Sequence, residues 1–352
     1  MAQKGARLGW GILAAGKIAH KFARGILHSA TGRIAAVASR DAGRAEAFAG
    51  EFGIARHYDN YQALLEDREV RVVYVATPHP FHAEWAIRAA ESGKHVLCEK
   101  PIGMNRREAE AIVEAARANG VFLMEAFMYR CQPQTARLVE LVRSGILGEV
   151  RAIRASFSYL GKYDLEGLKL NKRLGGGGIL DVGCYPVSLS RLLAGAASGK
   201  AFAEPLEVRG QARLNPQTGV DEYATALLSF PGGILAELAA GVQLARDNTA
   251  TVYGTAGRLE IPSPWFGGGI EGGVSRLVVR SNEGEVVQEI EIVTREWLYA
   301  LEADTVAASL DRGEAPPPAM GCADTLGNME TLDRWRGCVG LEYESDQRRG
   351  RT

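Results

Sequence analysis

The sequence predicts an α/β protein with an N-terminal doubly wound parallel sheet and a C-terminal α/β domain built on a large, mostly antiparallel open sheet. Three observations support this expectation. The chain has 352 residues, a length that suits two domains. Its first part alternates short apolar runs with amphipathic stretches, and after about Gly148 the hydrophobic period changes to two.

The first part, from Arg7 to about Arg143, carries the parallel-sheet pattern. Strands are expected at residues 8–13, 34–38, 70–75, 95–98 and 121–124. Between them lie helical patterns in which apolar residues recur on one face, as at 109–116. Near-continuous apolar strands that alternate with helices are typical of a parallel sheet covered on both faces.

The second part has the alternation of half-exposed strands. Residues 208–214 alternate apolar and polar, residues 289–292 repeat the pattern, and turns are expected at 230–233 and 281–284. Helices are expected after Asp181, at 297–310 and at 323–339. We therefore divide the chain into a cofactor domain (1–147), a substrate and dimerisation domain (148–341) whose last helix packs back on the first, and a frayed polar tail (342–352).

Charge and composition narrow the function classes. Lysine plus arginine is 41 and aspartate plus glutamate is 42, so the net charge of −1 gives no electrostatic basis for nucleic-acid or anionic-membrane binding. The longest uncharged run, 223–236, is too short to span a membrane. Five scattered cysteines favour a reducing compartment, and we expect a cytoplasmic protein. Lys4 and the apolar run 8–15 resemble a signal peptide, but the first strand explains that run better.

A phosphate-binding turn is expected directly after the first strand. In the pattern G-x-G-x-x-G, the three glycine positions hold Ala14, Gly16 and Ala19. The middle glycine lets the backbone approach a pyrophosphate, and the following helix N-terminus offers free amides. A tight packing turn is the alternative. Cofactor contacts are expected from Gly11, Ile12, Leu13, Ala14, Gly16, Lys17 and Ile18.

The end of the second strand bears on the choice between NADP and NAD. Ser39 and Arg40 stand where an acidic residue would hold the ribose of NAD, and Arg44 follows one turn later. Both arginines suit a 2′-phosphate, so NADP is favoured over NAD. Asp41 is the competing signal, and we interpret it as the N-cap of a helix over 42–52.

Two motifs carry residues suited to acid–base chemistry. Lys100 follows an expected central strand at the edge where open α/β sheets bind ligands, although a solvated Glu99–Lys100 pair is the alternative. Asp181 and Tyr185 lie one helical turn apart, so a carboxylate and a phenol could face one substrate. A nearby Lys100 would lower the pKa of Tyr185. A flexible glycine loop, with Asp181 as N-cap and Tyr185 in the core, is the other interpretation.

At this point the motifs resemble a known family. They are Ala14-x-Gly16-x-x-Ala19, Ala76-Thr77-Pro78-His79-x-x-His82, Glu99-Lys100-Pro101, Met124-Glu125-Ala126 and Gly176-Gly-Gly-Ile-Leu-Asp181-Val-Gly-Cys-Tyr185, in this order. Over residues 7–341 the chain resembles the glucose–fructose oxidoreductase / inositol dehydrogenase / MocA family. Within that family it is most similar to the dimeric dihydrodiol dehydrogenases and NADP-dependent xylose dehydrogenases.

The resemblance implies an N-terminal Rossmann domain and a homodimer, or a higher homo-oligomer, formed through the C-terminal sheet. It implies catalytic roles for Lys100, Asp181 and Tyr185. Further cofactor contacts are implied at Thr77, Pro78, His79, His82, Glu99, Lys100 and Arg173. The chain departs from the pattern at Ala14 and at Lys172, where the branch often has tryptophan. No third ligand is spaced to join the two histidines, so no metal is expected.

The expected function is hydride transfer between the nicotinamide of NADP and a carbinol or carbonyl carbon of a sugar, polyol or dihydrodiol. Tyr185 would act as acid and base, Lys100 would polarise the substrate oxygen, and Asp181 would orient the substrate or the tyrosine. Two alternatives remain open. One is a non-catalytic NADP-binding regulator, and the other is a sugar-processing enzyme that uses the nicotinamide transiently without net redox.

Overall fold

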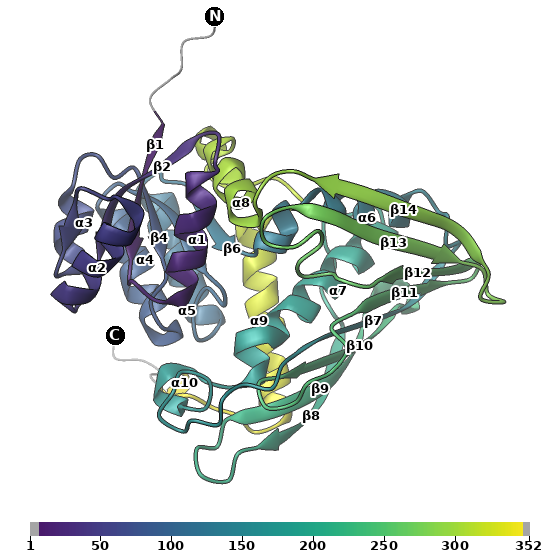
Figure 1. The fold of residues 1–352 in the computed structure, drawn as a ribbon. Coiled ribbons are helices and arrows are strands. Elements are labelled where there is room, and N and C mark those ends of the chain that lie inside the picture. The colour runs from purple at the N-terminus through teal and green to yellow at the C-terminus, as the bar shows by residue number, and fades with distance from the viewer. Residues whose placement is uncertain (1–6, 348–352) are drawn as a thin grey trace, which may run out of the picture.

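A computed structural model describes residues 7–347, and in it two β-sheets stand beside each other with helices between them (Figure 1). The first sheet, within these residues, has six strands in the order β3-β2-β1-β4-β5-β6, and neighbouring strands run parallel. This is the strand order of a dinucleotide-binding doubly wound sheet. The strands are β1 (Leu8–Leu13), β2 (Gly32–Ala38), β3 (His57–Tyr58), β4 (Val72–Val75), β5 (His95–Glu99) and β6 (Leu123–Ala126).

Helices connect these strands. They are α1 (Lys17–Leu27), α2 (Ala42–Phe52), α3 (Tyr61–Glu66), α4 (His82–Glu91) and α5 (Arg106–Ala118), followed by α6 (Pro133–Arg143). The central strands of this sheet are mostly apolar and buried, as in β4, where all four residues are buried. The parallel sheet predicted from the apolar runs is therefore confirmed.

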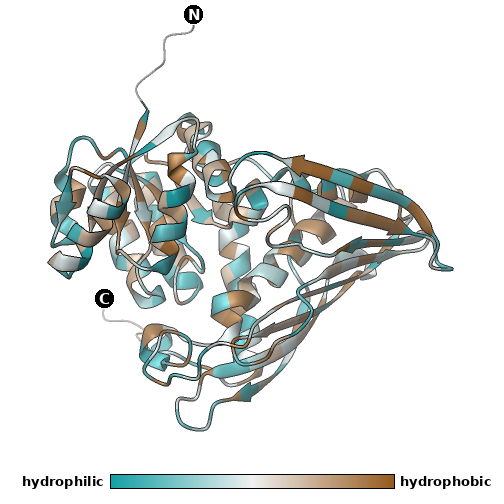
Figure 2. Cartoon of the chain, viewed as in Figure 1, coloured by the Kyte–Doolittle hydropathy of each residue, from teal (hydrophilic) through white to brown (hydrophobic). Residues whose placement is uncertain are grey.

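The second sheet, within the described residues, has eight strands in the order β14-β13-β12-β11-β7-β10-β9-β8. Its described pairs are antiparallel except β7 with β10. The strands are β7 (Val150–Ser158), β8 (Glu207–Leu214), β9 (Asp221–Ser229), β10 (Leu235–Gly241), β11 (Ala250–Gly254), β12 (Gly257–Ile261), β13 (Gly273–Arg280) and β14 (Val286–Thr294). Teal and brown alternate along several of them, which confirms the period of two (Figure 2).

Three long helices belong to the C-terminal half. They are α7 (Cys184–Ala197), α8 (Leu298–Ala307) and α9 (Cys322–Cys338), and the expected helical segments contain most of each. In Figure 1, α9 (yellow) runs between the two sheets and α8 (green) lies beside α1. The packing of α9 on the second sheet is close, because a Cβ at Gly210 would lie 2.6 Å from Trp335. The expected division at 147/148 stays a prediction.

The frayed tail that the sequence predicts is wrong for residues 342–347. Tyr343 is buried, and α10 (Glu344–Gln347) follows it. The Tyr343 hydroxyl donates to the main-chain oxygen of Gly176, and its backbone N–H donates to Asp346. The high polarity of this segment is explained by ion pairs rather than by solvation, since Asp346 pairs with Arg336. The rest of the predicted tail lies outside the described residues, as does Lys4.

Within residues 7–347, no helix combines the length and the apolar character needed to cross a bilayer.

Asp304 of α8 joins the C-terminal half to the first sheet. Its carboxylate accepts the backbone N–H groups of Ala30 and Thr31, both at 3.1 Å, and the hydroxyls of Ser29 and Thr31. Asp304→Asn removes the charge from these bonds, so we expect unfolding in urea at a lower concentration, with a loss of about 1–2 kcal/mol. An unchanged urea midpoint would show that the junction does not depend on this carboxylate.

Candidate active site

The turn between β1 and α1 has the features of a phosphate cradle. Gly11, Ile12 and Leu13 are buried inside β1, and Ala14 takes the left-handed backbone with φ 77°. Gly16 is the N-cap of α1 and makes no side-chain capping bond, so the amides of the first turn, which starts at Lys17 and Ile18, are available to a ligand.

Gly16 is not required by packing. Its φ of −90° suits any residue, and a Cβ built there would meet no protein atom within 4 Å. Gly11 differs, because a Cβ there would lie 2.6 Å from Leu64. The open space over Gly16 therefore fits a group that must come close to the backbone, as a pyrophosphate does.

The carboxyl end of β2 gathers charged groups at an exposed corner. Asp41 is the N-cap of α2 and accepts the Arg44 backbone N–H at 3.1 Å, which confirms its predicted capping role. The Arg40 guanidinium lies 5.5 Å from the centroid of the Phe81 ring. Arg44 is exposed, with Nε 3.6 Å from Asp41 Oδ2, and Ser39 Oγ accepts the Asp41 N–H. Two guanidinium groups thus stand near the position expected for a ribose phosphate.

The segment after β4 combines an unsatisfied hydroxyl with two fixed histidines. Thr77 Oγ1 is buried and has no hydrogen-bond partner in the described chain. Pro78 starts a short 3-10 helix over His79–Phe81. Both nitrogens of His82 lie 2.8 Å from carbonyl oxygens, those of Pro101 and Thr77. Burial lowers the pKa of His82 to about 4, so the ring is neutral and donates to one of the two carbonyls.

His79 connects the two halves of the site. Its Nδ1 lies 3.0 Å from the main-chain oxygen of Gly175, in the glycine run that precedes Asp181. Burial, His82 and Lys100 lower the pKa of His79 to about 3. A neutral His79 therefore donates to Gly175 and holds the glycine run against the first domain.

Lys100 follows β5 at the carboxyl edge of the first sheet. Its Nζ donates to the main-chain oxygen of Asp181 at 2.7 Å and lies 3.7 Å from Asp181 Oδ1. Burial lowers its pKa, but the neighbouring Asp181, Cys184 and Glu99 outweigh burial and raise it overall, so the ammonium stays charged. Glu99 is buried and accepts the Tyr74 hydroxyl and the Lys100 backbone N–H rather than forming an ion pair with the ammonium. The alternative of a solvated Glu99–Lys100 pair is therefore wrong.

Asp181 lies at the centre of the site. It is part of a π-helical turn, Ile179–Gly183, that leads into α7. Its Oδ1 lies 2.6 Å from Lys169 Nζ, and its Oδ2 accepts the Tyr159 hydroxyl. Burial raises the pKa of Asp181, but Lys169 and Lys100 lower it well below its usual range, so the carboxylate is ionised. The interpretation of Asp181 as a helix N-cap is wrong, because its oxygens bind side chains.

Tyr185 is beside Lys100, with one difference from the prediction. Lys100 Nζ lies 5.3 Å from the centroid of its ring, and its hydroxyl lies 3.3 Å from Met128 Sδ. Burial and the nearby Glu99 raise the pKa of Tyr185 well above 10. The expected lowering by Lys100 is wrong because the ammonium faces the ring rather than the hydroxyl, and the phenol is desolvated.

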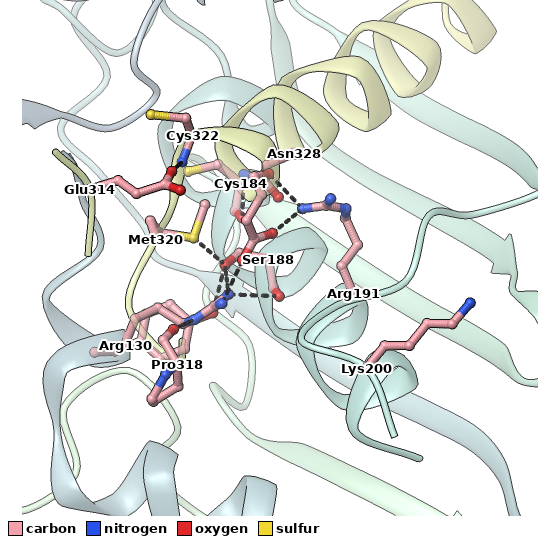
Figure 3. Close-up of polar contacts among 12 residues, drawn as sticks. Arg130, Cys184, Ser188, Arg191, Lys200, Glu314, Pro318, Met320, Cys322 and Asn328 are labelled. Carbon is pink, nitrogen blue, oxygen red and sulfur yellow. Dashed lines mark hydrogen bonds and ion pairs between the residues drawn. The ribbon is translucent and has the colours of Figure 1, made fainter. Parts of the chain in front are cut away.

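A buried cluster holds α7, the helix that carries Tyr185 (Figure 3). Ser188 lies three residues after Tyr185, and its hydroxyl and main-chain oxygens lie 2.8 and 3.2 Å from Arg130 Nη1. Arg130 and Arg191 both pair with the Asp324 carboxylate of α9. Arg191 also pairs with Glu204, whereas Asp324 is the carboxylate that pairs with Arg130, so loss of Asp324 would leave the buried Arg130 without its anion, and the shared carboxylate fixes α7 against α9.

Sequence reasoning missed two members of the site, and the cofactor contact expected of Arg173 stays a prediction. Lys169 and Tyr159 both bind Asp181, yet they belong to a loop whose path no periodicity indicates. Arg173 is exposed, and its backbone N–H donates to Asn171 Oδ1. Among the described residues its side chain makes no contact with Lys100, Asp181 or Tyr185.

Fold and site together define a protein in which a sheet with the strand order of dinucleotide-binding domains meets a cluster of charged and phenolic side chains. The chain belongs to the GFO/IDH/MocA oxidoreductase family. Residues 8–127 match the model of the oxidoreductase family with an NAD-binding Rossmann fold, and residues 135–260 match the GFO/IDH/MocA C-terminal domain. The resemblance and the Rossmann domain are thereby confirmed, and the protein is an oxidoreductase of this family.

The relatives act on diols and sugars. The chain is 33% identical to a trans-1,2-dihydrobenzene-1,2-diol dehydrogenase of Mus musculus, over 97% of this chain and 99% of the relative. It is 33% identical to a D-xylose 1-dehydrogenase (NADP(+)) of Haloferax volcanii, over 92% and 95%. A crystal structure of a 3-ketoreductase from Actinomadura kijaniata with NADP and TDP-benzene matches with a TM-score of 0.82 at 28% identity, over 95% and 98%. These relatives agree with the expectation of NADP as cofactor.

The described residues, 7–347, contain no group of three or more histidine, cysteine, aspartate or glutamate side chains placed to bind a metal ion.

The space over Gly16 gives a test of the cradle. In Gly16→Val the new Cβ would meet no protein atom but would fill the space proposed for a phosphate, so we expect at most a small drop in the unfolding temperature and at least 10-fold weaker NADPH binding, measured by fluorescence titration. Gly50→Val is the matched control, since a Cβ there also meets nothing within 4 Å. Tight binding by Gly16→Val would place the cofactor elsewhere.

Proposed function

We propose that the protein transfers a hydride between the nicotinamide of NADP(H) and a carbinol or carbonyl carbon of a sugar, polyol or dihydrodiol. The observation that carries this proposal is the position of the Lys100 ammonium between the Asp181 carboxylate and the Tyr185 ring. These groups come from both halves of the chain and meet at the carboxyl edge of the first sheet, where such sheets bind ligands.

The cofactor supplies the hydride chemistry, and the chain supplies position and charge. Gly16 and the first turn of α1 would hold the pyrophosphate, and Arg40 and Arg44 the 2′-phosphate. Thr77 Oγ1, buried without a partner, suits a polar group of the cofactor. The remaining proposed contacts are Gly11, Ile12, Leu13, Ala14, Lys17, Ile18, Ser39, Pro78, His79, His82, Glu99, Lys100 and Arg173.

Lys100 is proposed to polarise the substrate oxygen. Its charge persists because Asp181 compensates it at 3.7 Å. Tyr185 is proposed as the acid and base. The phenol is protonated at neutral pH, which is the state that donates a proton to a carbonyl oxygen, and the raised pKa means that it loses its proton only to a strong acceptor. Asp181 is proposed to orient Lys100, and it also accepts the Tyr159 hydroxyl from the loop after β7.

The two alternatives from the sequence have less support. A non-catalytic regulator needs no charged lysine beside a carboxylate and a phenol, yet all three are present. Transient use of the nicotinamide without net redox remains open, and measuring NADP(H) absorbance against product would distinguish it. An aldose–aldose oxidoreductase from Caulobacter crescentus matches with a TM-score of 0.83, but at 24% identity it bears on the fold alone.

The homodimer and the cytoplasmic location also remain proposals. The outer face of the second sheet carries exposed apolar side chains, among them Leu227 and Leu235. The same face has a hollow of about 750 Å³ lined by Arg154, Arg209 and Glu237, among other residues. Mixed apolar and charged groups on an open sheet are suited to a protein interface.

Lys100→Met and Tyr185→Phe test the catalytic assignment. Loss of the ammonium removes charge stabilisation, and loss of the hydroxyl removes the proton donor, so each should lower kcat by about 10²–10⁴. NADPH affinity should stay nearly unchanged in Tyr185→Phe, whereas Lys100→Met also loses a proposed cofactor contact. The measurement is NADPH absorbance with a substrate identified from a panel of sugars, polyols and diols. Lys94→Met and Tyr253→Phe, outside the site, serve as controls. Near-normal turnover of both site variants would refute the assignment.

Arg40→Glu tests the choice of NADP. It replaces a cation that favours the 2′-phosphate by an anion that repels it, so the Kd for NADPH should rise about 10–100-fold while that for NADH stays the same or falls. Arg88→Glu is the matched control, since Arg88 also stacks on an aromatic ring, 4.9 Å from the centroid of Trp85. Equal losses for both cofactors would mean that Arg40 does not read the phosphate.

A further inference from the structure

The glycine run before Asp181 rests on a buried carboxyl group that the proposed mechanism does not use. Asp221 begins β9 and is fully buried. Its Oδ2 accepts the Ile179 backbone N–H at 2.7 Å, and it is also hydrogen-bonded to the backbone of Gly178. Its Oδ1 has no partner in the described chain.

The contact between Asp221 and the run is too close for any side chain. A Cβ at Gly177, whose φ is +120°, would lie 2.3 Å from Asp221 Oδ1 and 3.1 Å from the Tyr343 hydroxyl. A Cβ at Gly178 would lie 3.1 Å from Asp221 Oδ2. The glycines therefore serve close approach to Asp221 and Tyr343, in addition to any freedom they give the chain.

Tyr343 holds the run from the C-terminal segment. Its hydroxyl donates to the main-chain oxygen of Gly176, and it is itself held on both sides. Its backbone N–H donates to Asp346 at 2.8 Å, and the Arg336 guanidinium lies 5.2 Å from the centroid of its ring. Asp346 is tied to the first domain by Asn105, at 2.9 Å. In Figure 1, α10 accordingly lies beside the loop that precedes α7.

The placement of the run decides the placement of the charged cluster. The Asp181 N–H donates to Gly177 at 3.1 Å, so the π-helical turn starts inside the run. Lys100 in turn donates to the main-chain oxygen of Asp181. A glycine segment loses much conformational entropy on ordering, and it stays ordered only if bonds from outside hold it.

We propose that Asp221 and Tyr343 are positioning residues that clamp Gly176–Gly178 from opposite elements and so keep Asp181 in register with Lys100. Neither residue touches the proposed reacting atoms. The expected effect on kcat rests on the proposed function. The ordering of Gly176–Gly178 by Asp221 and Tyr343 does not depend on that function.

Stability alone does not account for Asp221. Burial raises the pKa of this carboxyl to about 7, because desolvation outweighs the backbone donors and Arg336. Desolvation of the carboxyl group and the unbonded Oδ1 thus offset part of the stability that its backbone hydrogen bonds contribute. The function of Asp221 at the site is therefore to hold the backbone of Gly178 and Ile179 through its hydrogen bonds.

The experiment compares four variants. Asp221→Ala removes both oxygens, Tyr343→Phe removes one hydroxyl, and Asp221→Asn keeps one amide oxygen as an acceptor. Asp304→Asn is the matched control, since Asp304 also accepts backbone N–H groups between elements but lies away from the glycine run. Each is assayed for kcat, KM and NADPH affinity, and for amide hydrogen exchange in peptides that cover residues 176–183, without substrate.

We expect faster exchange at 176–183 in Asp221→Ala and Tyr343→Phe. In the same variants kcat should fall about 10-fold or more, because a small displacement of groups at a reacting centre slows the reaction strongly. NADPH affinity should stay within about 2-fold of that of the unchanged protein. Asp221→Asn should recover most of the activity, and Asp304→Asn should change neither quantity at the site. Should Asp221→Ala fail to fold, Tyr343→Phe and Asp221→Asn still decide the result.

Normal exchange at 176–183 in both Asp221→Ala and Tyr343→Phe would overturn the clamp, whatever the activities are. So would an equal loss of kcat in Asp304→Asn, which would show a general effect of stability. If exchange rises but the Lys100→Met variant keeps full activity, the clamp stands and the proposed function fails.

Discussion

The site depends on the burial of one carboxylate, Asp181, between two lysines. Lys100 comes from the end of β5 in the first sheet, and Lys169 comes from the loop that follows β7 in the second. Because a buried carboxylate without its cations would be strongly disfavoured, the two halves must meet in register for the cluster to exist. Beside this cluster, His79 with Gly175 and Asn105 with Asp346 are two further contacts between the halves.

The sequence allowed the parallel sheet, the cofactor turn and the three catalytic candidates to be predicted, for a physical reason. Period, glycine placement and strand ends are local properties, and the carboxyl ends of parallel strands converge without further information. Lys100 and Asp181 belong to such local patterns. The short β3 and several strands of the second sheet were not predicted, and in β10 four consecutive residues from Leu238 onward are buried, so that strand lacks a period of two.

What the sequence did not indicate is how irregular segments pair at long range. Lys169 and Tyr159 reach Asp181 across a loop without periodicity, and Tyr343 reaches Gly176 from a segment whose charge predicted solvation. Much of that charge is neutralised by ion pairs within the fold, because Arg336 pairs with both Asp333 and Asp346. The same limit explains the error at Tyr185, because spacing brought an ammonium near the phenol but did not determine whether it faced the ring or the hydroxyl.

The charges around Asp181 favour the chemistry that a carbonyl reduction or its reverse requires. Two ammonium groups face one carboxylate and His79 is neutral, while Glu99 lies close enough to raise the pKa of both Lys100 and Tyr185. An oxygen that gains negative charge during hydride transfer would be stabilised there, and a neutral phenol beside it can release a proton. The Tyr185 hydroxyl now faces only the weak acceptor Met128 Sδ among the described residues, so a substrate oxygen would replace a poor partner with a better one. Burial raises the pKa of Tyr185 and thus keeps the phenol protonated until an acceptor arrives.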